Sequence, residues 1–397
     1  MRTLILSCCL SFLLTTPFSG HAQNNLPDVP VPAWTHLSSQ TGELPKPDVG
    51  RQVAALIQDI NLDGENDFVI ASYTKMAWFR YNPDDQNWTR YLIEGGMPEG
   101  SLEAGGAFYD VNGDGSPDLV MGSAWQGEGG VWWWENPAPD FNPDTPWTRH
   151  LVVQVGGQHH DQLIGDFTGE GTPQLVFWDN HSGRLYLARI PSDPTQPWKA
   201  IVIAQVPLDG GRPEGLAGED INGDGNPDIV GGGWWFEHLT GDNFQSHPVN
   251  PERQFSRTAV GQLIQGGRPE IILGSGDGVG PLEMYQWKGG QWVSKSLIPK
   301  MDHGHTLQVA DLNGDGNPDI FTAEMYDPGA GEQCRSYVLY GDGQGNFRTE
   351  ILSTGIGSHE SKVGDLNGDG RPDILQKDFQ HEQRIDIWLN QGISNQE

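Results

Sequence analysis

The sequence predicts an all-β protein, a seven-bladed β-propeller of four-stranded blades, and three observations support this fold class. An acidic loop of nine residues recurs seven times along the 397 residues. Short apolar strands flank every copy of the loop, and no helical periodicity separates them. An aromatic residue begins the last strand of each repeat. Four strands repeated at such a period are typical of propeller blades.

The acidic loop gives the number of blades. Five copies carry the full pattern Asp-x-Asn-x-Asp-Gly-x-x-Asp, and two are degraded. The loops start at Asp59, Asp110, Asp166, Asp220, Gln262, Asp311 and Asp365, so that successive starts are 42 to 56 residues apart. The third loop keeps oxygen ligands at Asp166, Thr168 and Glu170, whereas the fifth, residues 262–270, keeps little besides the turn and its final acid.

The aromatic residues give an independent count and predict how the ring closes. They are Trp34, Trp88, Trp147, Trp198, Phe244, Trp292 and Phe347. The first precedes every acidic loop, and the chain ends soon after a third strand, residues 384–389. We therefore expect the N-terminal strand to complete the last blade and to remove the open edges of the ring.

The first residues resemble an export signal. Arg2 precedes an apolar run from Leu4 to Leu14, and a small residue, Ala22, follows at a suitable distance for cleavage. The predicted organisation is a signal peptide over 1–22, a short leader over 23–33 and the propeller over 34–397. The apolar run is too short to span a bilayer, so we expect a secreted or periplasmic protein without membrane insertion.

Charge and cysteine content narrow the partners and the source of stability. The formal net charge of −30 argues against nucleic acid and anionic membrane surfaces as partners. Once the signal peptide is removed, Cys334 is the one cysteine left, and it has no intramolecular disulfide partner. A lone thiol is the simpler interpretation of Cys334, with a metal ligand as the alternative.

The five intact acidic loops are predicted to hold calcium. Positions 1, 3, 5 and 9 present side-chain oxygens, and the glycine at position 6 permits the tight turn that brings them together; Ca²⁺ prefers such hard ligands. The expected ligands are Asp59, Asn61, Asp63, Asp67, Asp110, Asn112, Asp114, Asp118, Asp220, Asn222, Asp224, Asp228, Asp311, Asn313, Asp315, Asp319, Asp365, Asn367, Asp369 and Asp373. About five structural ions are therefore expected, with a weak sixth site at Asp166 as an open alternative.

An EF-hand does not fit these loops, because position 12 is never glutamate and the flanking segments are strands. The loops instead resemble the FG-GAP or VCBS propeller repeat. That resemblance implies a structural role for the calcium and does not identify an activity.

The opposite face of the propeller is predicted to carry the functional site. It is built by the connections between blades and by the loops between second and third strands. These segments hold the candidate residues His159, His160, Glu214, His303, His305, Tyr326, His359 and Lys377. Because residues entering innermost strands point toward the axis, we expect the five histidines to share one cavity. Such a cluster suits either a divalent metal such as Zn²⁺ or acid–base catalysis.

Two tryptophans near the same loops are candidate platforms for a sugar ring. They are Trp125 and Trp234, and indole faces stack well on sugars. The alternative is that both indoles simply pack between neighbouring blades.

Several short stretches resemble the propeller domain of aldos-2-ulose (anhydrofructose) dehydratases and related carbohydrate-active propellers. They are Asp302-His-Gly-His305, Gly215-Leu-Ala, Trp234-Trp-Phe-Glu-His238 and Ser275-Gly-Asp-Gly-Val-Gly-Pro281. The resemblance implies β-elimination on a carbohydrate, in which a base removes a proton next to a carbonyl or carboxylate group.

Under that resemblance the base is His160, His303 or His305, which the sequence does not rank. Tyr326 and His359 would act as acid partners, while Lys377 and Glu214 would hold charge, a metal or the substrate; His159 would contact the substrate. Two other classes stay open. One is a non-catalytic carbohydrate- or protein-binding propeller of the adhesion type, and the other is a hydrolytic or oxidative enzyme.

Overall fold

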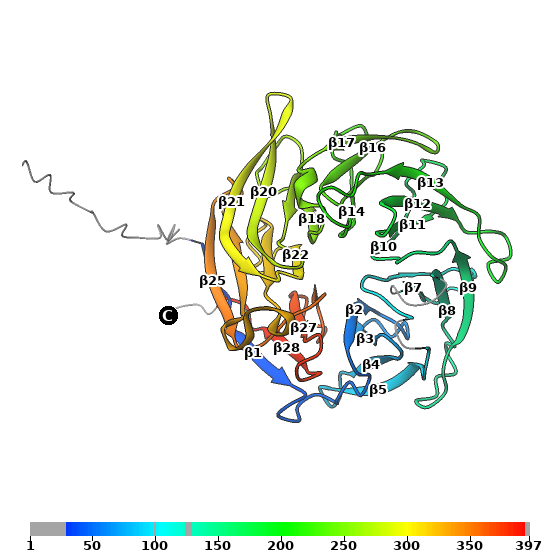
Figure 1. Ribbon diagram of the computed structural model, residues 1–397. Coiled ribbons are helices and arrows are strands. Elements are labelled where there is room, and N and C mark those ends of the chain that lie inside the picture. The colour runs from blue at the N-terminus through cyan, green and yellow to red at the C-terminus, as the bar shows by residue number, and fades with distance from the viewer. Residues whose placement is uncertain (1–28, 99–100, 124–128, 394–397) are drawn as a thin grey trace, which may run out of the picture.

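The chain folds into a closed ring of seven antiparallel four-stranded sheets, which confirms the predicted fold class (Figure 1). The computed structural model describes residues 29–98, 101–123 and 129–393. The predicted signal peptide, most of the predicted leader and Trp125 lie outside the described residues.

The first four blades follow one another along the chain. Blade one contains β2 (Gln52–Gln58), β3 (Asp67–Ser72), β4 (Met76–Asn82) and β5 (Asn87–Glu94). Blade two contains β6 (Ala107–Tyr109), β7 (Asp118–Gly122), β8 (Gly130–Glu135) and β9 (Thr148–Gln154). Blade three contains β10 (Gln162–Gly165), β11 (Gln174–Asp179), β12 (Arg184–Arg189) and β13 (Ala200–Gln205). Blade four contains β14 (Ala217–Glu219), β15 (Asp228–Gly231), β16 (Trp234–Thr240) and β17 (Asn243–Pro248).

The last three blades complete the circle. Blade five contains β18 (Thr258–Gly261), β19 (Glu270–Leu273), β20 (Val279–Lys288) and β21 (Gln291–Asp302). Blade six contains β22 (Thr306–Ala310), β23 (Asp319–Ala323), β24 (Arg335–Gly341) and β25 (Phe347–Thr354). Blade seven contains β26 (Lys362–Gly364), β27 (Asp373–Lys377) and β28 (Ile385–Asn390), and its fourth strand is the N-terminal β1 (Trp34–Ser38).

This last pairing closes the ring as the sequence predicts. Strand β1 runs antiparallel to β28, with Trp34 opposite Asn390 and Ser38 opposite Asp386. The first strand of the chain therefore shares one sheet with the last three strands, and the pairing of β1 with β28 closes the ring.

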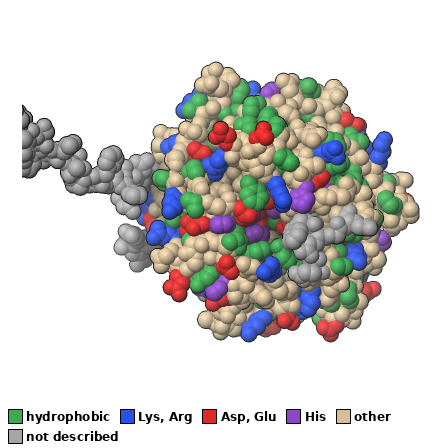
Figure 2. All heavy atoms as spheres, in the orientation of Figure 1, with side chains coloured by type: hydrophobic (Ala, Val, Ile, Leu, Met, Phe, Trp, Pro, Cys, Tyr) green, Lys and Arg blue, Asp and Glu red, His purple; other side chains and the backbone are tan. Residues whose placement is uncertain are grey.

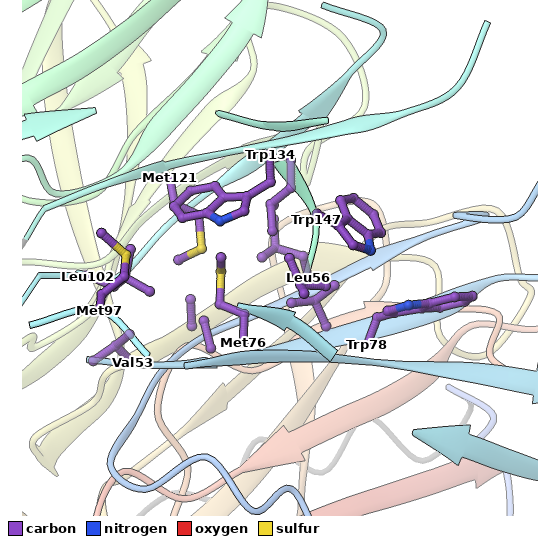
Figure 3. Packing of buried hydrophobic residues seen from close by; sticks show 14 of the residues in the cluster. Val53, Leu56, Met76, Trp78, Met97, Leu102, Met121, Trp134 and Trp147 are labelled. Atoms are coloured by element: carbon purple, nitrogen blue, oxygen red, sulfur yellow. The ribbon is translucent and has the colours of Figure 1, made fainter. Parts of the chain in front are cut away.

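The hydrophobic core lies between the blades, because each strand turns alternate side chains toward the blade on either side. Between blades one and two, Met76 and Trp78 of β4 meet Met121 of β7 and Trp134 of β8, and all four are fully buried (Figure 3). Burying each such side chain contributes roughly 2–3 kcal/mol. Cys334 is also fully buried as a free thiol.

Helical structure is limited to short turns. These are η1 (Pro251–Arg253), η3 (Gly331–Gln333) and the irregular turn η2 (Tyr326–Ala330). None of the helical turns in the described ranges has the length and apolar character that a membrane-crossing helix needs.

The antiparallel order of the strands decides which loops share a face. The acidic loops all join a first strand to a second strand, so they lie on one face of the ring. The connections between blades and the loops from second to third strands lie on the other. Histidine and acidic side chains gather in the middle of the face seen in Figure 2.

Candidate functional site at the propeller axis

A cavity of about 350 Å³ lies where the blade connections meet at the axis; we call it the central cavity. Its volume is at the small end of ligand sites, enough for one or two sugar rings. The connections and loops of blades two to four supply a polar wall: Glu103, Gln158, His160, Asn180, Arg212 and Glu214, with His181 beside them. The other blades supply an apolar wall: Tyr73, Phe255, Met325, Pro328 and Phe379.

Three further polar residues stand among the apolar ones. They are Asp277 from the β19–β20 loop, His305 directly before β22, and His359 ahead of β26. The propeller brings them together because the segments that enter innermost strands from different blades approach one another at the axis.

His160 is held between two carboxylates. Its Nδ1 lies 2.6 Å from Asp161 Oδ2, and its Nε2 lies 3.5 Å from Glu214 Oε1. Burial alone would lower the pKa of His160, but the carboxylates of Glu214 and Asp161 outweigh it and raise that pKa to about 10. His160 is therefore a cation at neutral pH.

Glu214 has the opposite character. Burial raises its pKa to about 7, against the lowering effect of His160. Its Oε2 is buried without a hydrogen-bond partner among the described residues. A carboxyl group that is partly protonated near neutral pH and has a free oxygen on the cavity wall can exchange a proton with a ligand.

Arg257 connects the charges behind the cavity. Its Nη2 lies 2.5 Å from Asp161 Oδ1 and 2.8 Å from Glu360 Oε1, and its Nη1 lies 3.9 Å from Glu214 Oε2. Burial would raise the pKa of Asp161, but Arg257 and His160 outweigh it, so Asp161 stays ionised. The buried arginine thus keeps Asp161 charged beside His160.

His305 and His359 form a second group on the far wall. His305 Nε2 lies 2.9 Å from Asp277 Oδ1 as an ion pair, and neither of its buried ring nitrogens makes a hydrogen bond in the described part of the chain. His359 Nδ1 lies 2.9 Å from Lys377 Nζ, which also donates to the carbonyl oxygen of Gln52. Burial lowers the pKa of His359 well below its usual value, and the lysine lowers it further. A neutral His359 that accepts at Nδ1 carries its proton on Nε2.

The predicted convergence of five histidines is wrong for two of them. His159 is fully buried outside the cavity lining, and its Nδ1 lies 3.2 Å from the carbonyl oxygen of Trp178. Its neighbour His160 does line the cavity, so these two adjacent residues have different surroundings. His303 has a φ of 52°, and its ring pairs with Asp302 at 2.6 Å instead of lining the cavity.

Other predicted site residues also lie elsewhere. The ring of Tyr326 stacks on His381, with centroids 3.7 Å apart, and does not line the cavity. Trp234 packs against the hydrophobic cluster between blades three and four, which matches the packing alternative. Lys377 is fully buried and does not line the cavity, but its Nζ contacts the imidazole of His359, which does. The aromatic surface of the cavity comes instead from Tyr73, Phe255 and Phe379.

Sequence reasoning missed three of the charged residues at the axis. Asp161 directly follows His160, Arg257 directly precedes β18, and Asp277 stands within the glycine-rich stretch 275–281. The position of Arg257, at the entry to an innermost strand, was the available signal. None of the three belongs to a motif that names its role.

The central cavity does not fit the predicted zinc ion. Both nitrogens of His160 lie against carboxylates, and Nδ1 of His359 lies against Lys377, so a zinc ion bound by these nitrogens would have to displace those partners. In the described ranges, no three His, Cys, Asp or Glu side chains are grouped as metal ligands.

The acidic loops offer a different donor set, which includes asparagine. In blade one, Asp59 accepts hydrogen bonds from the backbone N–H groups of Asp63 and Gly64, at 3.1 and 2.9 Å. Asn61 Nδ2 lies 2.7 Å from Asp63 Oδ2. These hard oxygens lie within one tight turn and fit Ca²⁺.

The ninth loop position has a structural role in every blade. Asp67 Oδ2 accepts from the backbone N–H of Ile60, and its Oδ1 accepts from that of Tyr81 in β4. Asp118, Asp228, Asp319 and Asp373 accept from the same backbone positions. In the degraded loops, Gln174 accepts from the corresponding N–H of Phe167, and Glu270 accepts from the N–H of Ile264, one position further along its loop. This bond explains why position 9 stays a hydrogen-bond acceptor where other ligands are lost.

In each of the two blades whose acidic loop is degraded, an arginine makes contacts with the neighbouring blade four. In blade three, Arg189 contacts Glu170 at 2.9 Å and Asp242 of blade four at 2.7 Å. In blade five, the guanidinium of Arg268 lies 4.6 Å from the ring centroid of Trp287 and 5.2 Å from that of Trp235. Each degraded blade therefore has a protein cation that joins it to blade four.

Comparisons with known proteins agree with the fold. Residues 59–121 and 266–322 match the FG-GAP-like repeat. No curated protein matches the sequence of the chain.

Solved structures show the same architecture at low identity. BBS1N, crystallised in complex with ARL6DN, is 14% identical, with a TM-score of 0.58 over 92% of this chain and 99% of that chain. The exotype rhamnogalacturonan lyase YesX is 12% identical, with a TM-score of 0.50 over 92% of this chain and 76% of that chain. A Bacillus licheniformis rhamnogalacturonan lyase is 14% identical, with a TM-score of 0.48 over 92% and 75%. Such likeness shows the fold alone.

Proposed function

We propose that the chain is a carbohydrate lyase or dehydratase that performs β-elimination in the central cavity. One observation carries the proposal: an imidazole with a carboxylate partner, His305 with Asp277, shares a small amphipathic cavity with a cationic imidazole, His160. The rhamnogalacturonan lyase YesX has a similar fold, so the fold is compatible with a carbohydrate lyase. The argument itself rests on the chemistry of the residues.

The geometry ranks the three candidate bases. His303 does not line the cavity, and His160 is held as a cation by Asp161 and Glu214. His305 remains. Asp277, 2.9 Å from its Nε2, would stabilise the positive charge that His305 gains when it accepts the proton of a substrate C–H group.

Elimination develops negative charge on the oxygen of the enolate, and the cavity holds groups that stabilise it. His160 offers positive charge, and the neutral His359 offers an N–H donor at Nε2. Both are buried, where such interactions are stronger than in water. Lys377 holds the imidazole of His359 in place through the contact between its Nζ and His359 Nδ1.

Glu214 completes the proton balance. The carbon–oxygen bond to the leaving group breaks as the double bond forms, and the leaving oxygen needs a proton. With a pKa of about 7, Glu214 carries that proton in a good fraction of molecules near neutral pH. His305 gains one proton and Glu214 loses one, so solvent resets the site after each turnover.

The acidic loops are proposed as structural calcium sites on the opposite face. The oxygens of positions 1, 3, 5 and 9 would hold each ion, and the ion would cross-link the loop. We further propose that the protein is exported after residues 1–22 are removed and that its partner is a carbohydrate.

Absorbance near 235 nm tests the proposed reaction, because elimination leaves a conjugated double bond. Purified protein is mixed with a panel of keto-sugars and uronate polymers in the presence of calcium. We expect an absorbance increase with at least one substrate and none for His305→Ala. Binding of sugars without any absorbance change would favour the non-catalytic, adhesion-type propeller.

A further inference from the structure

An asparagine on the polar wall of the central cavity, Asn180, makes no hydrogen bond with its side-chain amide in the described part of the chain. The side chain of Asn180 is 1% exposed, and neither its Oδ1 nor its Nδ2 has a hydrogen-bond partner in the described ranges. Leaving buried polar atoms unpaired costs about 1–3 kcal/mol each. Because Asn180 lines the cavity, a ligand there can supply the missing partners.

The loop that carries Asn180 is held rigidly in this position. Asp179 Oδ1 accepts from the backbone N–H of His181 at 3.1 Å, and the N–H of Asn180 donates to the carbonyl oxygen of Gln158 at 3.0 Å. Gly157, with a φ of 85°, leaves room for this carboxylate, since a Cβ there would lie 2.2 Å from Asp179 Oδ1. The amide of Asn180 is thus fixed at the cavity by the loop and not by bonds of its own.

Its neighbour shows the contrast. Both polar atoms of the Gln158 amide have a hydrogen-bond partner. Its Nε2 donates to Glu103 Oε2 at 2.5 Å, and its Oε1 accepts from Arg212 Nη1 at 3.4 Å. Glu103, Gln158 and Arg212 are thus paired with one another, whereas the donor and the acceptor of the Asn180 amide are both unpaired in the described ranges. Glu214 Oε2 also accepts no hydrogen bond in the described ranges, although it lies 3.9 Å from Arg257 Nη1.

We propose that Asn180 is a specificity-determining residue that hydrogen-bonds the hydroxyl groups of a sugar ring in the central cavity. A hydroxyl both donates and accepts, as the amide does, and two adjacent hydroxyls match its two atoms. The apolar wall with Tyr73, Phe255 and Phe379 covers the other side of such a ring. The inference rests on the carbohydrate ligand of the proposed function but not on the elimination step.

Asn180→Leu tests the proposal against a matched control, Asn136→Leu. Asn136 is equally buried, at 2% exposure, but its Nδ2 donates to the carbonyl oxygens of Ile60 and Pro117. We expect Asn136→Leu to lower the melting temperature by several degrees and Asn180→Leu to leave it unchanged or raise it. A loss of stability in Asn180→Leu equal to that of Asn136→Leu would show that Asn180 is structural and overturn the proposal.

Ligand binding is measured separately by saturation-transfer NMR with a panel of methyl glycosides and their single-deoxy forms. We expect signals with the wild-type protein that are lost in Asn180→Leu, and a weaker signal for the glycoside that lacks the recognised hydroxyl. Equal signals for wild type and Asn180→Leu, or no wild-type signal with any glycoside, would overturn it. Binding through Asn180 with no absorbance change near 235 nm would instead refute elimination and leave this subsite standing.

Discussion

The imidazole rings of His305 and His359 are stacked at the propeller axis, with centroids 4.8 Å apart and an angle of 14° between their planes. They come from the connections that enter blades six and seven. Two imidazolium ions cannot share such a stack at low cost, and Lys377 beside His359 further disfavours a charge on that ring. His359 is therefore favoured in its neutral form, and in the proposed reaction the proton taken from the substrate goes to His305, next to Asp277.

Replacement of His305 tests the assignment of the base. His305→Ala is expected to lower kcat by about 10²–10⁴-fold with little change in melting temperature, because it removes the proton acceptor and opens onto an existing cavity. His303→Ala is the matched control, since that nearby histidine does not line the cavity, and it should retain activity. Loss of activity in His303→Ala with retention in His305→Ala would reverse the assignment.

Stability should fall as pH rises through the range in which His160 loses its proton. Its pKa is about 10 in the folded protein against an ordinary value of 6.5, so its contribution is fully present below pH 6.5 and is lost toward pH 10. Glu214 acts in the same direction between pH 4.5 and about 7. The groups that face His160 here are Asp161, Glu214 and, more remotely, Glu103.

The comparison of wild type with His160→Gln isolates this effect. The difference in melting temperature between the two proteins should be large at pH 6 and should narrow toward pH 10, as measured by thermal denaturation. A difference that does not depend on pH would contradict the buried cation.

Removal of calcium should destabilise the propeller. Binding to the folded state alone adds about 2.7 kcal/mol per site at roughly a hundredfold excess of calcium over Kd. We expect chelation followed by dialysis to lower the melting temperature substantially. In the untreated protein, we expect elemental analysis to find about five calcium ions per chain. An unchanged melting curve, or seven bound ions, would contradict the ligand assignment.

Gln174 separates the structural role of the ninth loop position from calcium binding. Its Oε1 accepts the backbone N–H of Phe167 at 2.8 Å in a loop that lacks the full ligand set. Gln174→Ala should lower the free energy of unfolding by about 1–3 kcal/mol, equally with calcium and with chelator. Denaturant unfolding measures it, and a loss seen only with calcium would assign the residue to an ion site.

Arg268 is expected to stabilise the junction of blades four and five. Its guanidinium lies over the rings of Trp235 and Trp287, and such contacts contribute about 0.5–2 kcal/mol. Arg268→Met keeps much of the side-chain volume but removes the charge, so it should lower the free energy of unfolding by about this amount, with calcium content unchanged. A variant as stable as the wild type would show that packing alone joins the blades.

The sequence by itself determined the propeller and the face that carries the cavity. Strand alternation and turn residues are local signals, and seven repeats of one antiparallel four-stranded unit form a ring that closes when the N-terminal strand completes the last blade, with Trp34 opposite Asn390. The same topology places His160, His305 and His359 at the axis, because the entry to each innermost strand is a fixed position in the repeat.

Only the tertiary structure decided which side chains face the cavity and which are charged. His159 and His160 are neighbours, but His159 is buried outside the cavity lining whereas His160 lines the cavity. The charge of His160 depends on Asp161, Glu214 and Arg257, which come from three different connections and follow no common motif. A pKa is set by burial and by charges a few ångströms away in space, and neither distance nor burial is encoded in the spacing of residues along the chain.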